Sequence, residues 1–335
     1  MRPVADAGST ARRAYWDGRA SDIPRVTHAR TAVVLAFAIV AGACGAAAPI
    51  QGSVAVTSAA PTAEPTAAPT IAPTTAPSAK PTATPEPDYT KQPAISNDLE
   101  PYIQQVIEAE RAVRDPNVTG KKLEWYGWMQ QLTFGQLADF PEWADPLLKA
   151  LPADVRPGVE GTLNAGKELR RLKGPTPKTF PEWKIVEPKP IDTLMSFYRE
   201  AEREFGVPWY YLASINLVET RMGRIRGVSS AGAQGPMQFM PGTWDAYGGG
   251  GNVNDEHDAI LGAARYLKAS GAPKDIDNAL FAYNRHLGYV NAIKGYAEVM
   301  RRDPTAYRGY HGWQVYYPTV EGIFHLAPGW TKPAD

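Results

Sequence analysis

Cysteine is nearly absent from this sequence. Cys44 is the single cysteine among 335 residues, so the chain can form no intramolecular disulfide and no zinc site built on several cysteines. Net charge is missing as well, because 35 lysines and arginines balance 35 aspartates and glutamates. The sequence therefore lacks the overall positive charge that would indicate a nucleic-acid partner. The fold must depend on the packing of hydrophobic residues, which make up 44% of the sequence.

Several well-known site motifs are also missing. The sequence has no G-x-S-x-G, no phosphate-cradling glycine loop and no dinucleotide-binding fingerprint. The histidines after residue 250 lack the spacing of metal ligands. Asn252, Asn254, Glu256 and Asp258 alternate as oxygen ligands do at the start of a calcium loop, but His257 stands where that loop needs glycine. We therefore expect no metal and no cofactor, and we expect the acidic residues to cap a helix.

The N-terminal part, residues 1–48, is typical of an export signal. Arginines precede an apolar run from Thr31 to Ala43, and Cys44 follows at once. The run is short for a membrane span, which needs about 20 apolar residues. Ala41-Gly42-Ala43-Cys44 resembles a bacterial lipoprotein cleavage box, which implies that Cys44 becomes the lipidated first residue. An uncleaved helix reaching Ile50 and a buried core segment are the alternatives. We expect the protein at the outer face of the cell membrane or in the cell envelope, attached through a lipid or an N-terminal helix.

The rest of the chain divides by composition. Residues 49–96 are rich in proline, threonine and alanine, and they are predicted to be a disordered tether of about 3.1 Å per residue or a linker without a task. Residues 97–173 carry apolar residues at helical spacing and predict a small helical region of unknown role. Residues 174–190 form a proline-rich joint. Residues 191–335 are expected to fold by themselves as a mostly α-helical domain, with a C-terminal extension that forms a hairpin.

The last segment places a carboxylate on an apolar helix face. Gly206 and Pro208 predict the end of one helix and the start of the next. Glu219 lies on the apolar stripe of that second helix; the stripe consists of Leu212, Ile215, Val218 and Met222. Burial would raise the pKa of this carboxyl and leave it protonated near neutral pH, ready to donate a proton. The alternative is an ordinary glutamate near a helix end, paired with Arg221 or Arg224.

A glycine-rich polar stretch follows this helix. Its serine and glutamine side chains suit the hydroxyl and acetamido groups of a sugar, and its aromatic residues offer apolar faces. The stretch could equally form a tight surface loop. The residues concerned are Gly223, Gly227, Ser229, Ser230, Gly232, Gln234, Gly235, Gln238, Phe239, Trp244 and Tyr247.

Three blocks of sequence form a longer pattern. They read VET at 218–220, SSAGAQGPMQFMPGTW at 229–244 and AYN at 282–284. The pattern resembles the lytic murein transglycosylases with an SLT, or goose-type lysozyme-like, catalytic domain, and the match covers about residues 191–300. The resemblance implies that Glu219 is the single catalytic acid and base, that Ser229 and Gln238 help to hold the glycan, that Tyr283 touches or orients the carboxyl, and that Asn284 lines the cleft.

The sequence departs from the family pattern in three places. Thr220 replaces the usual serine, one extra residue separates Glu219 from Ser229, and Arg285-His286 replaces the common Ala-Gly. The first change keeps a hydroxyl, and the other two put substrate detail in doubt.

The resemblance implies cleavage of the MurNAc-GlcNAc β-1,4 bond of peptidoglycan glycan strands with formation of 1,6-anhydro-MurNAc. Two alternatives remain, namely a lysozyme-like hydrolase with water as acceptor and a non-catalytic cell-wall glycan-binding lipoprotein. The sequence points to no particular protein partner.

Overall fold

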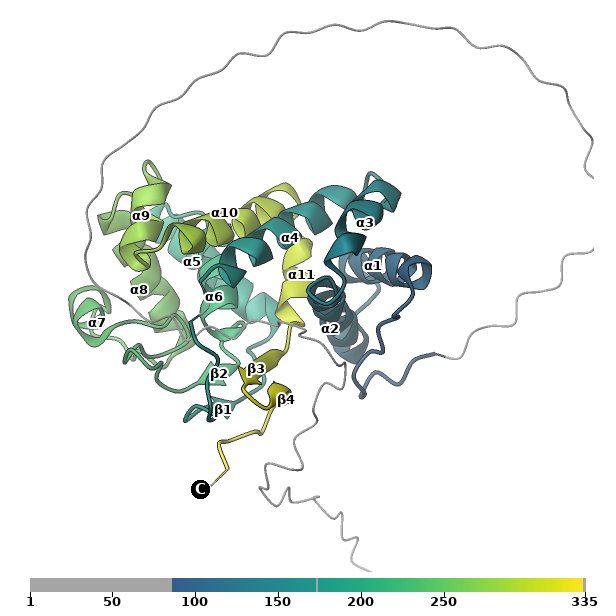
Figure 1. Ribbon diagram of the computed structural model, residues 1–335. Coiled ribbons are helices and arrows are strands. Elements are labelled where there is room, and N and C mark those ends of the chain that lie inside the picture. The colour runs from purple at the N-terminus through teal and green to yellow at the C-terminus, as the bar shows by residue number, and fades with distance from the viewer. Residues whose placement is uncertain (1–85, 173, 334–335) are drawn as a thin grey trace, which may run out of the picture. The chain divides into compact units, whose positions relative to one another are not determined.

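Helices make up most of the chain that the computed structural model describes, which is residues 86–172 and 174–333. This confirms the expectation of a mostly α-helical protein. Residues from Tyr89 onward form one unit (Figure 1). Cys44, the apolar run before it and the tether up to residue 85 lie outside the described residues, so the interpretations placed on them stay predictions. Within the described ranges, no helix is both long enough and apolar enough to span a bilayer.

The first group of helices precedes the proline-rich joint. It consists of α1 (Leu99–Arg114), α2 (Gly120–Gln136), the short 3-10 helix η2 (Pro141–Trp143), α3 (Ala144–Ala150) and α4 (Arg156–Arg170). The second group follows the joint. It consists of α5 (Ile191–Phe205), α6 (Trp209–Thr220), α7 (Pro241–Tyr247), α8 (Glu256–Ala269), α9 (Ile276–Tyr283), α10 (Leu287–Arg302) and α11 (Ala306–His311).

Local sequence signals set several of these helix ends. Gly206 ends α5 in the left-handed conformation at φ 73°, where a residue without Cβ carries no steric cost. Pro208 precedes α6 directly. Asp255 caps α8, because its carboxylate accepts hydrogen bonds from the backbone N–H groups of His257 and Asp258. This confirms the capping role expected for the acidic residues near His257.

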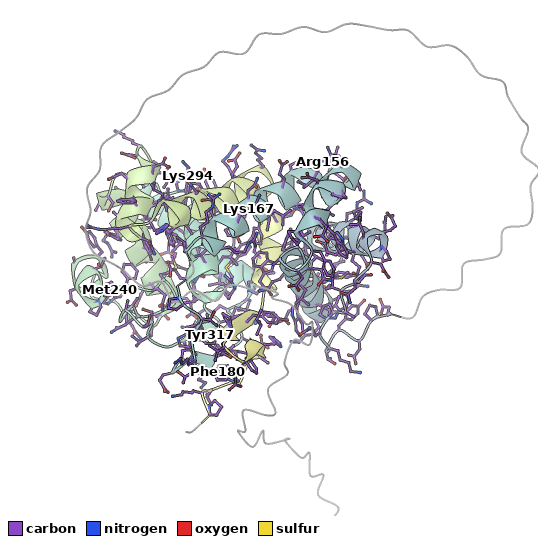
Figure 2. All side chains as sticks on the ribbon, in the orientation of Figure 1. Arg156, Lys167, Phe180, Met240, Lys294 and Tyr317 are labelled. Carbon is purple, nitrogen blue, oxygen red and sulfur yellow. The ribbon has the colours of Figure 1, made fainter. Side chains whose placement is uncertain are left out.

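Two small antiparallel pairs of strands complete the fold. β1 (Lys184–Ile185) pairs with β2 (Ile225–Arg226), and β3 (Val315–Thr319) pairs with β4 (Gly322–Leu326). The second pair confirms the predicted hairpin. The joint packs against it, since the Phe180 and Tyr317 rings lie 6.0 Å apart (Figure 2) and Trp183 is buried with them. The proline-rich joint is therefore a packed part of the fold.

The helical region at 97–173 and the segment at 191–335 share one hydrophobic core. α4 lies along α10, as Figure 1 shows. The two helices approach closely at small residues, because a Cβ on Gly295 would lie 2.9 Å from Ala165 Cβ and one on Gly161 would lie 2.5 Å from Val299 Cγ2. One continuous cluster of buried side chains runs from Tyr102 to Trp313. This shared core argues against independent folding of residues 191–335.

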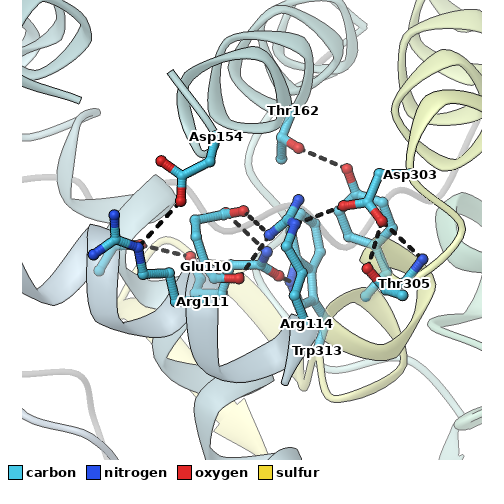
Figure 3. A network of polar contacts seen from close by, with 11 residues as sticks. Glu110, Arg111, Arg114, Asp154, Thr162, Asp303, Thr305 and Trp313 are labelled. Carbon is cyan, nitrogen blue, oxygen red and sulfur yellow. Dashed lines mark hydrogen bonds and ion pairs between the residues drawn. The ribbon is translucent and has the colours of Figure 1, made fainter. Parts of the chain in front are cut away.

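Buried polar groups connect the same two segments (Figure 3). Arg114 of α1 forms ion pairs with Glu110 and, at 2.6 Å, with Asp303 just after α10. Gln130 of α2 donates to Glu110 Oε1 and accepts from Trp313 Nε1, both at 2.9 Å. Because each of these buried groups has a partner, the network fixes how the two segments meet.

Candidate functional site

Glu219 lies in the last turn of α6, a helix buried on most of its surface. Leu212, Ile215 and Val218 of the predicted stripe are buried in the core. Glu219 itself is only partly buried, between two buried neighbours. The backbone then reverses, because Arg221 and Met222 both adopt positive φ, at 54° and 60°. The helix thus presents one carboxyl at the edge of the core, next to the start of the glycine-rich stretch.

A tyrosine holds this carboxyl. The hydroxyl of Tyr289, in the first turns of α10, donates a hydrogen bond of 2.8 Å to Glu219 Oε1. Tyr289 is completely buried, so its ring position is fixed by packing. α10 packs against α6, which brings together two residues that are 70 positions apart. The donor is neutral, and it orients the carboxyl without a paired charge.

The surroundings of Glu219 shift its protonation toward neutral pH. Burial raises the pKa of Glu219 to about 7, and the hydrogen bond from Tyr289 opposes part of that rise. Among the described residues, no charged side chain contributes to this pKa shift. At a pKa of about 7 both forms of the carboxyl are populated near neutral pH. The group can therefore donate a proton in one step and accept one in the next.

Tyr283 lies next to Tyr289, the residue that binds Glu219. Its hydroxyl donates to the backbone oxygen of Met237 at 2.6 Å, and its ring is parallel to that of Tyr289 with centroids 6.5 Å apart. The hydrogen bond to Glu219 thus comes from Tyr289, whereas the family resemblance implies that Tyr283 touches or orients the carboxyl. Tyr283 instead ties the end of α9 to the polar stretch. Sequence reasoning missed Tyr289, for which the available signal was a large aromatic residue early in the helix after the AYN block.

The hydroxyl of Thr220 anchors the polar stretch under α6. Thr220 Oγ1 donates to the Pro236 backbone oxygen at 2.6 Å, and Asn216 Nδ2 donates to the same oxygen at 2.9 Å. Gly235 must be a glycine here, because a Cβ would lie 1.8 Å from the Val253 backbone oxygen. Thr220, which stands where the family pattern has serine, therefore still provides the hydroxyl for this contact.

Ser229 and Gln238 shape the loop to which they belong. Ser229 Oγ accepts a hydrogen bond from the Ala233 N–H at 3.0 Å, and Gln238 Nε2 donates to the Gly235 backbone oxygen at 2.9 Å. Both side chains stay partly exposed. Gln238 follows Met237, whose backbone oxygen accepts the hydrogen bond from Tyr283, so the loop is tied to the end of α9 next to Gln238. Ser229 lies further along the loop.

Asn284 follows α9 directly and is partly exposed. Its backbone N–H bonds to the Leu280 oxygen at 3.0 Å, and its own oxygen accepts from the His286 N–H at 2.7 Å. Arg285 beside it is exposed. The AYN block thus ends α9 and begins the turn that leads to α10, the helix that supplies Tyr289.

Of three other carboxylates near the loop, two have structural partners and one is exposed. Asp255 caps α8, Asp258 Oδ2 accepts from the Asn252 N–H at 2.8 Å, and Asp245 is exposed on α7. In the described part of the chain, ligand atoms of Asp255, His257 and Asp258 lie within 4.8 Å of one another, so these side chains are the ones that could hold a cation. They belong to the cap of α8 and not to the group around Glu219.

The two arginines that could have paired with Glu219 as an ordinary helix-end residue have other partners. Arg224 pairs with Glu124 and Glu187, each at 3.2 Å, and Arg221 donates to the Leu217 backbone oxygen at 2.7 Å. The site therefore consists of one carboxyl of raised pKa, a tyrosine donor and an adjoining polar loop.

Comparison of the chain with protein-family models, with curated proteins and with solved structures finds no match in any of the three.

Proposed function

We propose that this protein is an exported lytic transglycosylase that cuts peptidoglycan glycan strands at the MurNAc-GlcNAc β-1,4 bond. One observation carries the proposal: Glu219 is a partly accessible carboxyl with a pKa of about 7, held by the neutral donor Tyr289 beside a loop of amides and hydroxyls. The sequence pattern at 218–220, 229–244 and 282–284 supports the same assignment and extends it to a lysozyme-like fold for the catalytic part.

In the first step, protonated Glu219 donates its proton to the glycosidic oxygen. The acetamido oxygen of MurNAc attacks the anomeric carbon, the bond to the glycosidic oxygen breaks, and GlcNAc leaves with a new 4-hydroxyl. In the second step, the Glu219 carboxylate removes the proton of the MurNAc 6-hydroxyl as that oxygen attacks the anomeric carbon. The acetamido group is restored, no water is consumed, and 1,6-anhydro-MurNAc is formed.

A single carboxyl is sufficient for this sequence of steps. Most glycosidases need a second carboxylate, as nucleophile or as base for water, about 5 to 9.5 Å from the first. Here the substrate supplies both the nucleophile and the acceptor hydroxyl. The absence, among the described residues, of any charged group that shifts the pKa of Glu219 is consistent with this division of roles. Proton transfer by such a positioned group contributes about 10²- to 10⁴-fold to the rate.

The competing functions differ in their products. A lysozyme-like hydrolase would use water as acceptor and leave reducing ends, and a glycan-binding lipoprotein would leave the strands intact. The raised pKa of Glu219 argues against the binding protein, because a site that only binds has no use for a carboxyl that titrates near neutral pH. Digestion of purified peptidoglycan followed by mass analysis tests the proposal. We expect fragments lighter by one water than the hydrolysis products, and fragments with reducing ends as the main product would favour the hydrolase.

A further inference from the structure

The turn that leads from α9 to α10 carries a cation that the fold leaves unpaired. Arg285 follows the AYN block directly and is exposed. Within residues 86–172 and 174–333, its guanidinium takes part in no hydrogen bond and no ion pair. By contrast, Lys294, the next cation along the chain, pairs with Asp277 at 2.6 Å. An exposed arginine without a partner keeps all of its donors available for a ligand.

The turn around Arg285 is held in place but is not covered. The His286 N–H donates to the Asn284 oxygen at 2.7 Å. His286 Nδ1 accepts from the Gly288 N–H at 3.0 Å and thereby caps α10. Leu287, the next residue, has the most exposed large hydrophobic side chain of the described chain, at 69%. The backbone at Arg285 is therefore fixed on both sides, while the side chains of the turn face solvent.

This turn joins two tyrosines that lie close to Glu219. Burial, and after it the nearby Glu219 carboxyl, raises the pKa of both Tyr283 and Tyr289. Arg285 comes two positions after the first tyrosine and four before the second. The length of the chain therefore keeps the Arg285 Cα within about 7 Å of the Tyr283 Cα. A long side chain at this position is within reach of a substituent on a sugar held at Glu219.

The guanidinium of Arg285 lies near the tyrosines without acting on the catalytic carboxyl. Burial raises the pKa of Tyr266 and Arg285 opposes that rise, so the cation is close to the Tyr266 hydroxyl. This hydroxyl donates to the Ala282 oxygen at 2.8 Å, and the Tyr266 ring lies 5.7 Å from that of Tyr283. Arg285 makes no contribution to the pKa of Glu219. The position of the cation thus suits recognition of the substrate and not proton transfer.

We propose that Arg285 binds a carboxylate on the lactyl arm of MurNAc, which is that of the arm itself or that of the peptide attached to it. This inference rests on the proposed function, since it names a further part of the same substrate. MurNAc differs from GlcNAc by this arm, so a cation beside the site distinguishes the two sugars. A guanidinium can bind a carboxylate through two parallel N–H···O hydrogen bonds. Arginine stands here in place of the alanine of the family pattern, so the contact is a feature of this chain.

Binding tests the contact without any cleavage. The full chain carrying Glu219→Gln is titrated with a neutral GlcNAc oligosaccharide, with bare strands of alternating MurNAc and GlcNAc, and with strands that keep their peptides. We expect Arg285→Gln to lower the preference for an anionic strand over the neutral ligand about fivefold, the upper range for one exposed ion pair. Added salt should reduce this preference when Arg285 is present and change it little in Arg285→Gln. Lys294→Gln (Figure 2), which removes a paired cation from the same helix, is the matched control.

The two anionic ligands identify the source of the carboxylate. A loss of preference on bare strands assigns the contact to the lactyl carboxylate, and a loss confined to peptide-bearing strands assigns it to the peptide. The proposal is overturned if Arg285→Gln keeps the preference for both strands, if it weakens all three ligands equally, or if Lys294→Gln has the same effect. Cleavage by the wild-type protein tests the proposed function separately. A protein that shows the Arg285-dependent preference but releases no 1,6-anhydro-MurNAc would refute that function and keep the contact.

Discussion

At the residue scale, the site depends on how Glu219 is held. Burial favours the neutral carboxyl and the Tyr289 hydroxyl favours the carboxylate, and the balance places the pKa near 7. The two effects oppose each other, so each can be removed separately. Tyr283, parallel to Tyr289 but bonded to the Met237 backbone, offers a comparison on a ring of the same size.

Removing the Tyr289 hydroxyl should move the pH dependence of cleavage. Tyr289→Phe deletes a donor that stabilises the carboxylate, so the pKa of Glu219 rises above about 7. The first step needs the protonated acid, and we therefore expect the basic limb of the kcat/KM profile to shift to higher pH. Tyr283→Phe should move that limb less, because its hydroxyl donates to a backbone oxygen. A larger shift in Tyr283→Phe than in Tyr289→Phe would contradict this assignment.

The same carboxyl should make stability depend on pH. The pKa of Glu219 is raised from 4.5 to about 7 in the folded state. Below pH 4.5 both states hold the proton, but between pH 4.5 and 7 the unfolded state releases it first, so rising pH lowers the free energy of unfolding. The loss relative to Glu219→Gln should reach about 3 kcal/mol above pH 7. Urea unfolding of both proteins at pH 4 and pH 8 measures this difference, and a constant difference would refute it.

The sequence predicted part of this site. Helical spacing placed Glu219 on a buried stripe, and the motif pattern selected the loop at 229–244. Tyr289 was not predictable, because its contact depends on how α10 packs against α6 and not on local periodicity.

At the element scale, close crossings of helices join the two segments of the chain. α2 and α11 approach at Gly127, where a Cβ would lie 2.6 Å from the Gly309 backbone oxygen and 2.8 Å from the Gly312 Cα. Backbone atoms cannot move aside as a flexible side chain can. The helix boundaries near Gly206, Pro208 and Asp255 were predictable from local signals. The association of residues 97–173 with the later helices was not, because an apolar face indicates burial but not the partner that covers it.

The crossing at Gly127 gives a direct test of this shared core. Gly127→Ala should lower the free energy of unfolding by about 2 kcal/mol, because overpacking against backbone outweighs the better helix propensity of alanine. Gly242→Ala in α7 is the control, since no atom lies within 4 Å of its added Cβ. The readout is the midpoint of thermal or denaturant unfolding. Equal stability of the two variants would mean that α2 and α11 do not depend on this contact.

At the scale of the whole molecule, the proposed activity requires export. Cys44 lies outside the described residues, and its proposed lipidation rests on the apolar run and the small residues before it. We expect Cys44→Ser to abolish fatty-acid labelling and to release the protein from the membrane fraction. If labelling and membrane retention stay as in the wild type, an uncleaved N-terminal helix becomes the better account.

The central claim is that Glu219 transfers the proton in both steps. Glu219→Gln keeps nearly the same side-chain volume but can neither donate that proton nor take one back. The most direct measurement is the rate at which wild-type and Glu219→Gln proteins release 1,6-anhydro-muramic fragments from purified peptidoglycan. We expect a loss of at least about 10²-fold with the melting temperature and glycan binding retained. Undiminished release by a folded Glu219→Gln protein would contradict the account and would direct the search to Asp245, Asp255 and Asp258.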